Sequence, residues 1–506
     1  EGSPFRSVTV MGSPEANAIP VLGDETISVT LETPVYTSDE QAASTYEKIW
    51  TSLRSGASLR LCFNSSGKLE YIYMPSKTAS VSDDNVLVAK NKPTGSNNPF
   101  ASLSGGKTPA QIYKNGIPAE LSDLRQYDVG TYDKSSDTLF VSDLKLSGLY
   151  ENAYPNAAAP STVTVMGAKP TVLPSAQADL AAFKVGDKVT LLLTTTGQVA
   201  GAVSPDVAKS NAVGVATVDG TKATIELLDG ILTLEGQTTY SGAAAAKLNG
   251  CLVTVSSYKR DYLTLSKVNG KGASTALNLT TNRMGTKELS AGARFFEQVG
   301  NGRLVEIDRS DITIPANKIT YVGYDWAGRV DKLVLNDVTG DRYDYGIIHY
   351  QPAGYQETPG NPNGNGEYKN GEISVTNGSF PKGMTPYVVG SVDGAKTNRM
   401  GGVAGSLDQL DGQNRMAAFM PLNEAKGIRR AQFDTDAMLL TTNSMVIPIS
   451  DAVECYNKTT GDWFKPGEDG DHKAALNLAL AFSDDITVYY DRSPEEGGKV
   501  RIVVVE

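Results

Sequence analysis

The clearest pattern along the chain is an alternation of hydrophobic and polar positions that runs forward, turns and runs back. Val189, Leu191 and Leu193 occupy every second position before a polar turn that ends at Gly197, and the alternation resumes at Val199. Such period-two spacing places these side chains on one face of a strand. Glycine at the end of the turn suits a left-handed backbone position. This segment therefore predicts a β-hairpin.

The same pattern occurs three more times, around Gly67, Gly328 and Gly498, the last with a longer turn. The residues that carry it are Leu59, Leu61, Phe63, Leu69, Tyr71, Tyr73, Val322, Tyr324, Val330, Val334, Ile486, Val488, Tyr490, Val500, Ile502 and Val504. From 67 to 197, 197 to 328 and 328 to 498 the steps are 130, 131 and 170 residues, each about one small domain. A recurring hairpin unit predicts a string of β modules rather than one large catalytic domain.

Helical spacing is found in three places. Ser38 begins a capping-box pattern, and the hydrophobic residues that follow predict a helix over 38–54 that stops before Gly56. Shorter helices are predicted over 175–183 and 474–482, each directly before a hairpin. The repeating unit is therefore predicted to run strand, helix, hairpin.

Short motifs also recur. Ser7–Gly12 is matched by Thr162–Gly167, and Thr281–Gly285 is repeated letter for letter at Thr397–Gly401, which indicates duplication. Between the last two hairpins, Pro352–Gly366 is rich in Pro, Gly and Asn and is predicted to be irregular.

Together these patterns predict an all-β, multidomain protein of tandem small β-barrel or β-sandwich modules, built on repeated hairpins with a few short helices. The expected divisions are 1–125 (with the helix 38–54), 126–210 (repeating the strand, helix, hairpin unit), 211–350 (further β modules), 351–366 (linker or loop) and 367–506 (C-terminal β module). A length of 506 residues agrees, because it predicts about three to five domains.

Charge and composition narrow the functional classes. The net charge of −11 argues against a nucleic-acid partner, which requires a basic face. No apolar run approaches the roughly 20 residues of a membrane span. Cys62, Cys251 and Cys455 are dispersed and lack the spacing of a zinc site, so we expect small buried side chains.

Catalytic motifs are not found. The chain contains two histidines, His349 and His472, and neither has an acid–base setting in the sequence. A nucleophile elbow, a Walker-type loop and a dinucleotide fingerprint are all missing from the sequence. With 57 acidic residues, carboxylate pairs suited to a glycosidase arise by chance. We therefore predict no catalytic residues and no enzyme, with glycoside hydrolysis as the least favoured alternative.

Calcium is the one cofactor that the acidic stretches suggest, because it prefers carboxylate and carbonyl oxygens. The candidate ligands are Asp337, Asp341 and Asp344 in one stretch and Glu468, Asp469 and Asp471 in another. Neither stretch matches an EF-hand loop, so a solvated polar turn is the alternative for each.

Aromatic residues raise a second possibility, a platform for glycans. The candidates are Tyr71, Tyr73, Trp326, Trp463, Tyr489 and Tyr490. Cross-strand packing explains most of them, whereas Trp326 and Trp463 fall near turns and are expected to be exposed. The terminal run 500–505 is strongly β-forming, so it is buried, paired within its own domain, or paired between subunits.

Several segments resemble the non-anchor region of surface proteins that carry S-layer homology domains, from anaerobic Firmicutes. The segments are Asn98–Ala101, Ile112–Gly116, Leu124–Val129, Gly148–Glu151, Ser161–Gly167, Gly186–Leu193, Leu335–Asp341, Tyr345–Gly346, Tyr489–Asp491 and Gly497–Arg501, so the resemblance spans 98–506. The helical S-layer homology module itself is not found in this sequence. Direct attachment to the cell wall by these residues is therefore not expected.

The resemblance implies a structural, extracellular role at a bacterial cell surface, in a surface layer or associated with one. The partners would be copies of the chain or other surface-layer proteins, held by lateral contacts. An adhesin that recognises cell-wall or host glycans is the alternative.

Overall fold

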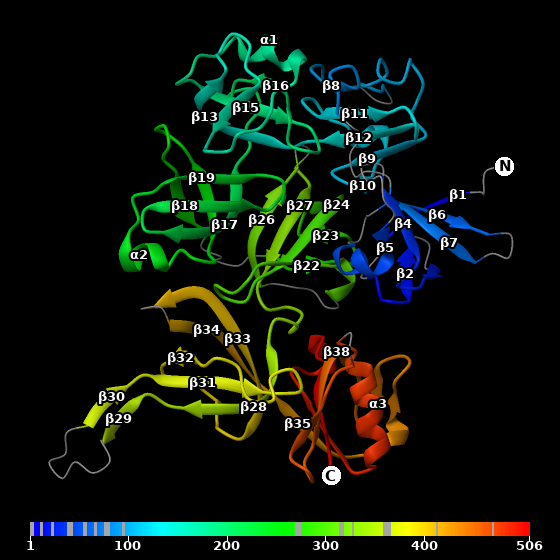
Figure 1. Ribbon diagram of the computed structural model, residues 1–506, viewed down its shortest axis with the longest axis vertical. Helices are drawn as coiled ribbons and strands as arrows, with labels where there is room; N and C mark the ends of the chain where they lie inside the picture. Colours follow the sequence, from blue (N-terminus) through cyan, green and yellow to red (C-terminus); the bar gives the residue numbers. More distant parts are fainter. Residues whose placement is uncertain are drawn as a thin grey trace.

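A computed structural model describes residues 5–10, 14–21, 25–37, 44–53, 58–64, 68–74, 81–93, 97–268, 275–312, 318–325, 328–357, 366–410, 413–467 and 470–506. The chain is mostly strand, 47% against 9% helix, and forms many separate sheets and barrel or half-barrel modules. Figure 1 shows these sheets following one another along the chain. The all-β, multidomain prediction is confirmed.

The N-terminal unit holds its own hydrophobic core around Leu61 and Ile72. Its sheet has the order β1-β6-β7-β4-β5, beside a separate pair β2-β3. Its elements are β1 (Phe5–Thr9), β2 (Ala18–Val21), β3 (Glu25–Ser28), β4 (Pro34–Thr37), β5 (Ser44–Thr45), η1 (Tyr46–Lys48), η2 (Trp50–Ser52), β6 (Ser58–Phe63) and β7 (Leu69–Met74).

The next sheet, called here the 86–142 sheet, has the order β10-β9-β12-β11-β8. Its elements are β8 (Val86–Val88), β9 (Gln111–Lys114), β10 (Ile117–Pro118), η3 (Leu121–Asp123), β11 (Val129–Asp133) and β12 (Thr138–Ser142). The predicted boundary at 125/126 falls inside this sheet, because β9 and β12 are parallel neighbours.

Residues 145–267 form two sheets, β14-β13-β15-β16 and β19-β18-β17-β20-β21, over one shared core. The predicted boundary at 210/211 therefore divides a single core. The elements are β13 (Lys145–Tyr154), β14 (Thr162–Val165), η4 (Pro174–Ala176), α1 (Gln177–Leu180), β15 (Lys188–Leu193), β16 (Val199–Val203), β17 (Ala212–Asp219), β18 (Lys222–Leu227), β19 (Thr233–Gln237), α2 (Gly242–Ala246), β20 (Leu252–Ser256) and β21 (Thr264–Lys267).

The 277–335 unit follows, with β24 and β27 as parallel central strands. Its elements are β22 (Leu277–Asn278), β23 (Arg283–Met284), β24 (Lys287–Glu297), β25 (Val305–Ile307), η5 (Arg309–Asp311), β26 (Ile319–Tyr324) and β27 (Val330–Leu335).

A closed barrel comes next, in the order β28-β31-β32-β34-β33, with a two-stranded arm, β29-β30, that extends away from it in Figure 1. The strands are β28 (Asp344–Gln351), β29 (Gly354–Glu357), β30 (Gly366–Lys369), β31 (Gly371–Thr376), β32 (Tyr387–Val389), β33 (Arg399–Leu410) and β34 (Gln413–Pro421). Within the predicted linker or loop, 351–366, the described residues include the last residue of β28, all of β29 and the first residue of β30, whereas 358–365 lie outside the described residues.

The C-terminal unit packs α3 over its sheet through Leu476, Ala479 and Leu480. Its elements are β35 (Asn423–Ile428), η6 (Arg430–Gln432), β36 (Phe433–Asp434), β37 (Leu439–Thr441), β38 (Val446–Asn457), β39 (Asp462–Phe464), α3 (His472–Phe482), β40 (Ile486–Tyr490), η7 (Pro494–Glu496) and β41 (Val500–Val505). Strand β41 is buried and pairs with both β38 and β40, so it is paired within its own domain.

All four predicted hairpins are confirmed, as β6-β7, β15-β16, β26-β27 and β40-β41. Each carries a β-bulge at the second residue of the returning strand, namely at Glu70, Ala200, Asp331 and Arg501. Such a bulge leaves the extra residue outside the strand pairing. The shared irregularity makes the four hairpins structurally equivalent, residue by residue.

The four hairpins also share one turn. The residue after the first strand donates its N–H to the carbonyl of the residue before the returning strand, and its side-chain oxygen accepts that residue's N–H. The pairs, with the two distances in Å, are Asn64 and Lys68 (2.9, 3.0), Thr194 and Gln198 (2.9, 3.1), Asp325 and Arg329 (2.9, 2.9), and Asp491 and Lys499 (3.3, 2.8). A short polar side chain at that position satisfies a backbone donor that the turn would otherwise leave open.

The turn glycines behave as predicted at two positions. Gly197 and Gly328 have φ of 83° and 77°, in the left-handed region. In the longer fourth turn, Gly497 takes this conformation with φ of 75° instead of the predicted Gly498. Gly67 lies outside the described residues.

The predicted helix over 38–54 is wrong for the residues that the structure describes there, 44–53. They form β5 and two 3₁₀ turns. The backbone N–H groups of Tyr46 and Glu47 donate to the carbonyls of Thr33 and Leu31, which draws the segment onto a neighbouring turn. Tertiary pairing therefore overrides the helical spacing. The other two predicted helices are present, as η4 with α1 and as α3.

The recurring sequence motifs do not mark equivalent places in the fold. Strand β1 pairs with the first hairpin strand β6, whereas β14 pairs with β13, so the matched motifs occupy different places. In the second repeat, Asn282 and Asn398 both have a left-handed backbone, with φ of 56° and 59°. That repeat therefore encodes a local turn.

Candidate functional site

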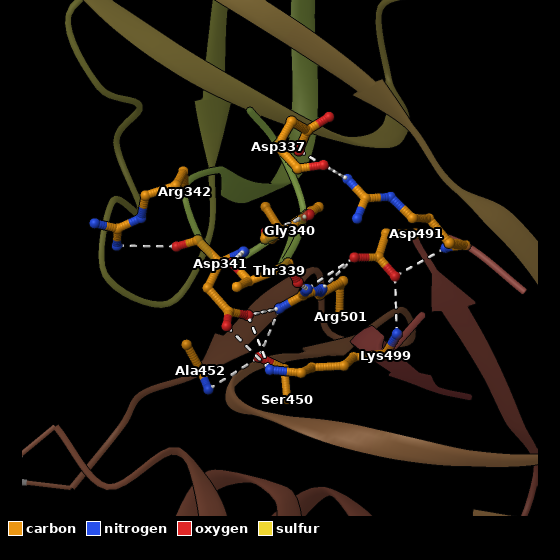
Figure 2. A network of polar contacts seen from close by, with 12 residues as sticks. Asp337, Thr339, Gly340, Asp341, Arg342, Ser450, Ala452, Asp491, Lys499 and Arg501 are labelled. Carbon is orange, nitrogen blue, oxygen red and sulfur yellow. Dashed lines mark hydrogen bonds and ion pairs between the residues drawn. The ribbon is translucent and has the colours of Figure 1, made fainter. Parts of the chain in front are cut away.

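Two of the predicted calcium ligands lie in the loop that follows β27, where the 277–335 unit, the barrel and the C-terminal unit meet. Figure 2 shows Asp341 and Arg501 pointing toward one another, with Lys499 beside them. Asp337 and Asp341 belong to the loop, whereas Arg501 and Lys499 belong to the C-terminal unit. The acidic stretch is therefore part of a joint between units.

Arg501 is the centre of this joint and is 1% exposed. Its Nε donates to Asp491 Oδ2 at 2.9 Å, and its Nη2 lies 2.8 Å from the same oxygen. One terminal nitrogen donates to Asp341 and to the Ser450 hydroxyl, and the other donates to the Thr339 carbonyl at 2.7 Å. Five contacts match the five donors of a guanidinium, so the buried cation is fully compensated.

The loop is also held from the other side. Glu297, at the end of β24, is fully buried and accepts hydrogen bonds from the backbone N–H groups of Val338 and Thr339 and from the Thr339 hydroxyl. Arg492 donates to Asp337 Oδ1 at 2.7 Å and to the Val338 carbonyl at 2.9 Å. Side chains from two units therefore fix one loop.

Nearby positive charges favour the ionised form of the Asp341 carboxyl group in this joint. Burial alone would raise the pKa of Asp341, but the charges of Arg501 and Lys499 outweigh it and lower the pKa below its usual value. The ion pair between Asp341 and Arg501 is therefore retained in mildly acidic solution.

The calcium prediction is not supported in the first stretch. Asp337 pairs with Arg492, Asp341 pairs with Arg501 and Lys499, and Asp344 begins barrel strand β28. In the second stretch, Asp471 caps α3 by accepting the Ala474 N–H at 3.1 Å. Glu468 and Asp469 lie outside the described residues. Within the described parts of the chain, no group of three or more His, Cys, Asp or Glu side chains is placed to hold a metal ion.

A second joint links the 277–335 unit to the 86–142 sheet and uses equivalent hairpin positions. Arg329 stands where Lys499 stands in the C-terminal unit, and its Nη1 lies 3.1 Å from Asp123 Oδ1 of the 86–142 sheet. Lys499 likewise lies 3.0 Å from Asp341. In both units the residue before the returning strand pairs with an aspartate outside its own unit.

The bulge position is also charged in both units. Asp331, the equivalent of Arg501, pairs with Lys332 at 2.8 Å. Burial raises the pKa of Asp331, and Lys332 opposes this effect. For nearby Asp143, burial would also raise the pKa, but Lys332, Lys114 and Lys145 outweigh it and lower the pKa. Charges from both units therefore stabilise one another at the second joint.

The barrel contacts the C-terminal unit at another point. Glu454, on β38, is 5% exposed, and its Oε2 accepts the backbone N–H of Gly378 at 2.8 Å. A Cβ atom on Gly378 would lie 2.8 Å from Glu454 Oε2 and 2.9 Å from the Phe464 carbonyl oxygen. Only glycine allows this approach. Burial, together with the charge of Asp344, raises the pKa of Glu454 to about 7.

Most of the predicted glycan-platform residues serve packing. Tyr71 contacts Tyr36 edge to face, and Trp463 packs on Tyr456 with ring centroids 4.9 Å apart. Trp463 is half-buried, which corrects the expectation that it is exposed. Tyr489 donates to Glu424 Oε1 at 2.7 Å, and Tyr490 packs against the C-terminal core. Tyr73, on β7, is half-buried, and Trp326 lies outside the described residues.

Each of the two histidines contacts one neighbouring polar group, and the cysteines lie in the interior. His349 contacts the Thr376 hydroxyl at 2.9 Å on the barrel surface. His472 contacts the Val453 carbonyl at 3.0 Å from the first turn of α3. The three cysteines are buried and unpaired, as predicted.

Sequence reasoning missed Arg501, Asp491, Glu297 and Gly378. One signal was available for the first of these. Arg501 interrupts the apolar run 500–505, and a charged residue inside a strongly hydrophobic strand indicates a buried ion pair. No comparable signal marks Glu297 and Gly378, because their partners lie 42 and 76 residues away in the sequence. Asp491 lies only ten residues from Arg501, across the predicted final hairpin.

Comparison with known proteins finds no protein-family model and no curated protein that matches this sequence. None of the helices in the described residues is both long and apolar enough to cross a membrane.

Proposed function

We propose that this protein is a non-catalytic structural subunit of a bacterial surface layer, or of a surface-layer-associated assembly, outside the cell. The observation that carries the proposal is the repeated joint. Equivalent hairpin positions, Arg329 and Lys499, each reach an aspartate outside their own unit. A string of small β units fastened by ion pairs, with the buried Arg501 beside one of them, is suited to bearing load in a fixed shape.

Lateral contacts between copies, or with other surface-layer proteins, would need open strand edges. The arm is a candidate, because β29 and β30 form a sheet of two strands and pair with no other strand in the described part of the chain. A two-stranded ribbon alone is marginally stable in water, and its unpaired backbone groups are a template for another strand. The arm therefore supports assembly by strand addition.

The test is electron microscopy of the purified chain, with calcium and with chelator, beside a variant that lacks the arm. Gln351 on β28 lies opposite Glu372 on β31, so a short glycine-containing turn can replace 353–370 and leave the barrel strands in place. We expect ordered sheets or filaments from the full chain in both solutions, and their loss in the armless variant.

A matched control keeps the arm and removes a surface feature elsewhere, such as Tyr258→Ala. Monodisperse particles of the full chain in both solutions would count against assembly. The runner-up function, glycan binding, would then be tested directly on immobilised cell-wall polymers. Exposed Tyr258 and Tyr262, with Lys188 and Lys259 over their rings at 5.0 and 4.3 Å, favour an acidic glycan.

A further inference from the structure

The contact between the barrel and the C-terminal unit places a nearly buried carboxyl group between two units that also share a hydrophobic cluster, which includes Tyr345 and Ile502. Glu454 comes from β38, and its Oε2 meets the Gly378 N–H from the turn after β31. Its other oxygen, Oε1, lies 3.9 Å from His472 Nδ1 on α3. That nitrogen also lies 3.0 Å from the Val453 carbonyl oxygen. A carbonyl can only accept, so Nδ1 donates its proton to Val453.

The Gly378 N–H favours the ionised form of Glu454, but burial and the negative charge of Asp344 outweigh it. Asp344, on barrel strand β28, raises the pKa of Glu454 through its negative charge. The neighbouring Cys455 thiol is buried, and burial raises its pKa, so it stays neutral. The contrast with Arg501 is clear, because Asp341 and Asp491 compensate that charge fully.

We propose that Glu454 makes the joint between the barrel and the C-terminal unit responsive to pH, closed when the carboxyl group is protonated and loosened when it is ionised. On ionisation, a nearly buried negative charge faces Asp344 across the joint. Separation of the two surfaces relieves both the repulsion and the loss of hydration.

The direction follows from proton linkage. Burial holds the pKa of Glu454 at about 7 in the closed joint, above its usual value of 4.5. A raised carboxyl pKa means that the closed joint binds the proton more tightly than the open one. Closure is therefore fully favoured below pH 4.5, weakens between pH 4.5 and about 7, and changes no further above that. Asp341 stays ionised through most of this window, so the Arg501 contacts do not share the transition.

Hydrogen exchange of the peptide that contains Gly378, corrected for the intrinsic pH dependence of exchange, tests the proposal in the full chain. The protection of this peptide should fall between pH 5 and pH 8. The fall is at most roughly 300-fold, the factor set by a difference of about 2.5 between the two pKa values. In Glu454→Gln, which keeps an acceptor but cannot ionise, protection should be independent of pH.

Glu495→Gln, an exposed glutamate of the same unit, is the matched control and should retain the wild-type profile. If Glu454→Gln does not fold, Asp344→Asn replaces it and should move the midpoint to lower pH. A flat wild-type profile overturns the proposal, and so does a variant at position 454 that still loses protection. These readouts are taken on single chains, so they are independent of whether the protein assembles.

Discussion

Arg501 has equivalents in the three other hairpins, yet among the four it is the only residue that is both charged and buried. The bulge residue is Glu70 in the first hairpin, Ala200 in the second, Asp331 in the third and Arg501 in the fourth. Glu70 is exposed, whereas Arg501 is buried. Because a bulge re-aims one side chain out of the strand pairing, this position is free to serve contacts with a neighbouring unit.

Replacing Arg501 tests the importance of that contact. Arg501→Met should lower the free energy of unfolding of the C-terminal unit by about 3–5 kcal/mol, because it leaves the Asp491 carboxylate buried without its cation. Urea unfolding followed by hydrogen exchange of peptides from 423–506 measures this change.

Arg260→Met is the control, since Arg260 is 60% exposed in its ion pair and should cost no more than about 0.5 kcal/mol. Equal effects of the two substitutions would contradict the role given to Arg501. The double variant Arg501→Met, Asp491→Asn should regain part of the loss, because it removes the stranded charge.

At the scale of elements, the four hairpins show how a local rule is reused. The acceptor in the turn is Asn64, Thr194, Asp325 or Asp491, and in each case a side-chain oxygen receives the same backbone N–H. These side chains differ in charge but share an oxygen at a short reach from the backbone. The turn therefore requires an acceptor, whereas the charges of Asp325 and Asp491 add ion pairs to Arg329 and Arg501 of the same hairpins.

Substitutions at Asp325 separate these two roles. Asp325→Ala should destabilise the 277–335 unit by about 1–3 kcal/mol, because it leaves the Arg329 N–H without an acceptor. Asp325→Asn keeps an acceptor, as Asn64 does in the first hairpin, and should cost less than half as much. Urea unfolding of both variants provides the comparison, and an equal loss from both would show that the ion pair to Arg329 dominates instead.

At the scale of the whole molecule, the barrel and the C-terminal unit share a hydrophobic cluster, which includes Ala404 and Ile502, and are also joined by a few close polar contacts. Gly378 is one of them, since a methyl group there would meet a carboxylate and a backbone carbonyl of the C-terminal unit. The carbonyl belongs to a paired strand and cannot move away easily. At this point of the joint, the close approach of the barrel to the C-terminal unit therefore requires glycine.

Gly378→Ala should weaken the joint by about 1–3 kcal/mol, as overpacking does elsewhere, and leave each unit folded. Small-angle scattering should detect a larger radius of gyration, with circular dichroism unchanged. Gly390→Ala is the matched control in the barrel, because nothing lies within 4 Å of its added Cβ. An unchanged radius for Gly378→Ala would mean that other contacts fix the two units.

Elements whose backbone partners are close in sequence were predictable, whereas elements that depend on distant partners were not. The alternation around Gly197 and Gly328 specified hairpins, and the run 474–482 specified a helix, because the neighbours that satisfy those backbones are close in sequence. Within 44–53, the described part of the predicted helix 38–54, the prediction was wrong because Tyr46 finds its backbone partner at Thr33 across a turn.

The sequence by itself determined the all-β class and the recurring hairpins, since both depend on period-two burial and on residues suited to tight turns. Only the tertiary structure decided the roles of the charged residues. Asp341 and Arg501 are 160 residues apart. The chain has 57 acidic and 46 basic side chains, so the sequence offers many other pairs of opposite charge. Their pairing depends on how the units pack, because a charge has no preferred partner until burial removes water as its alternative.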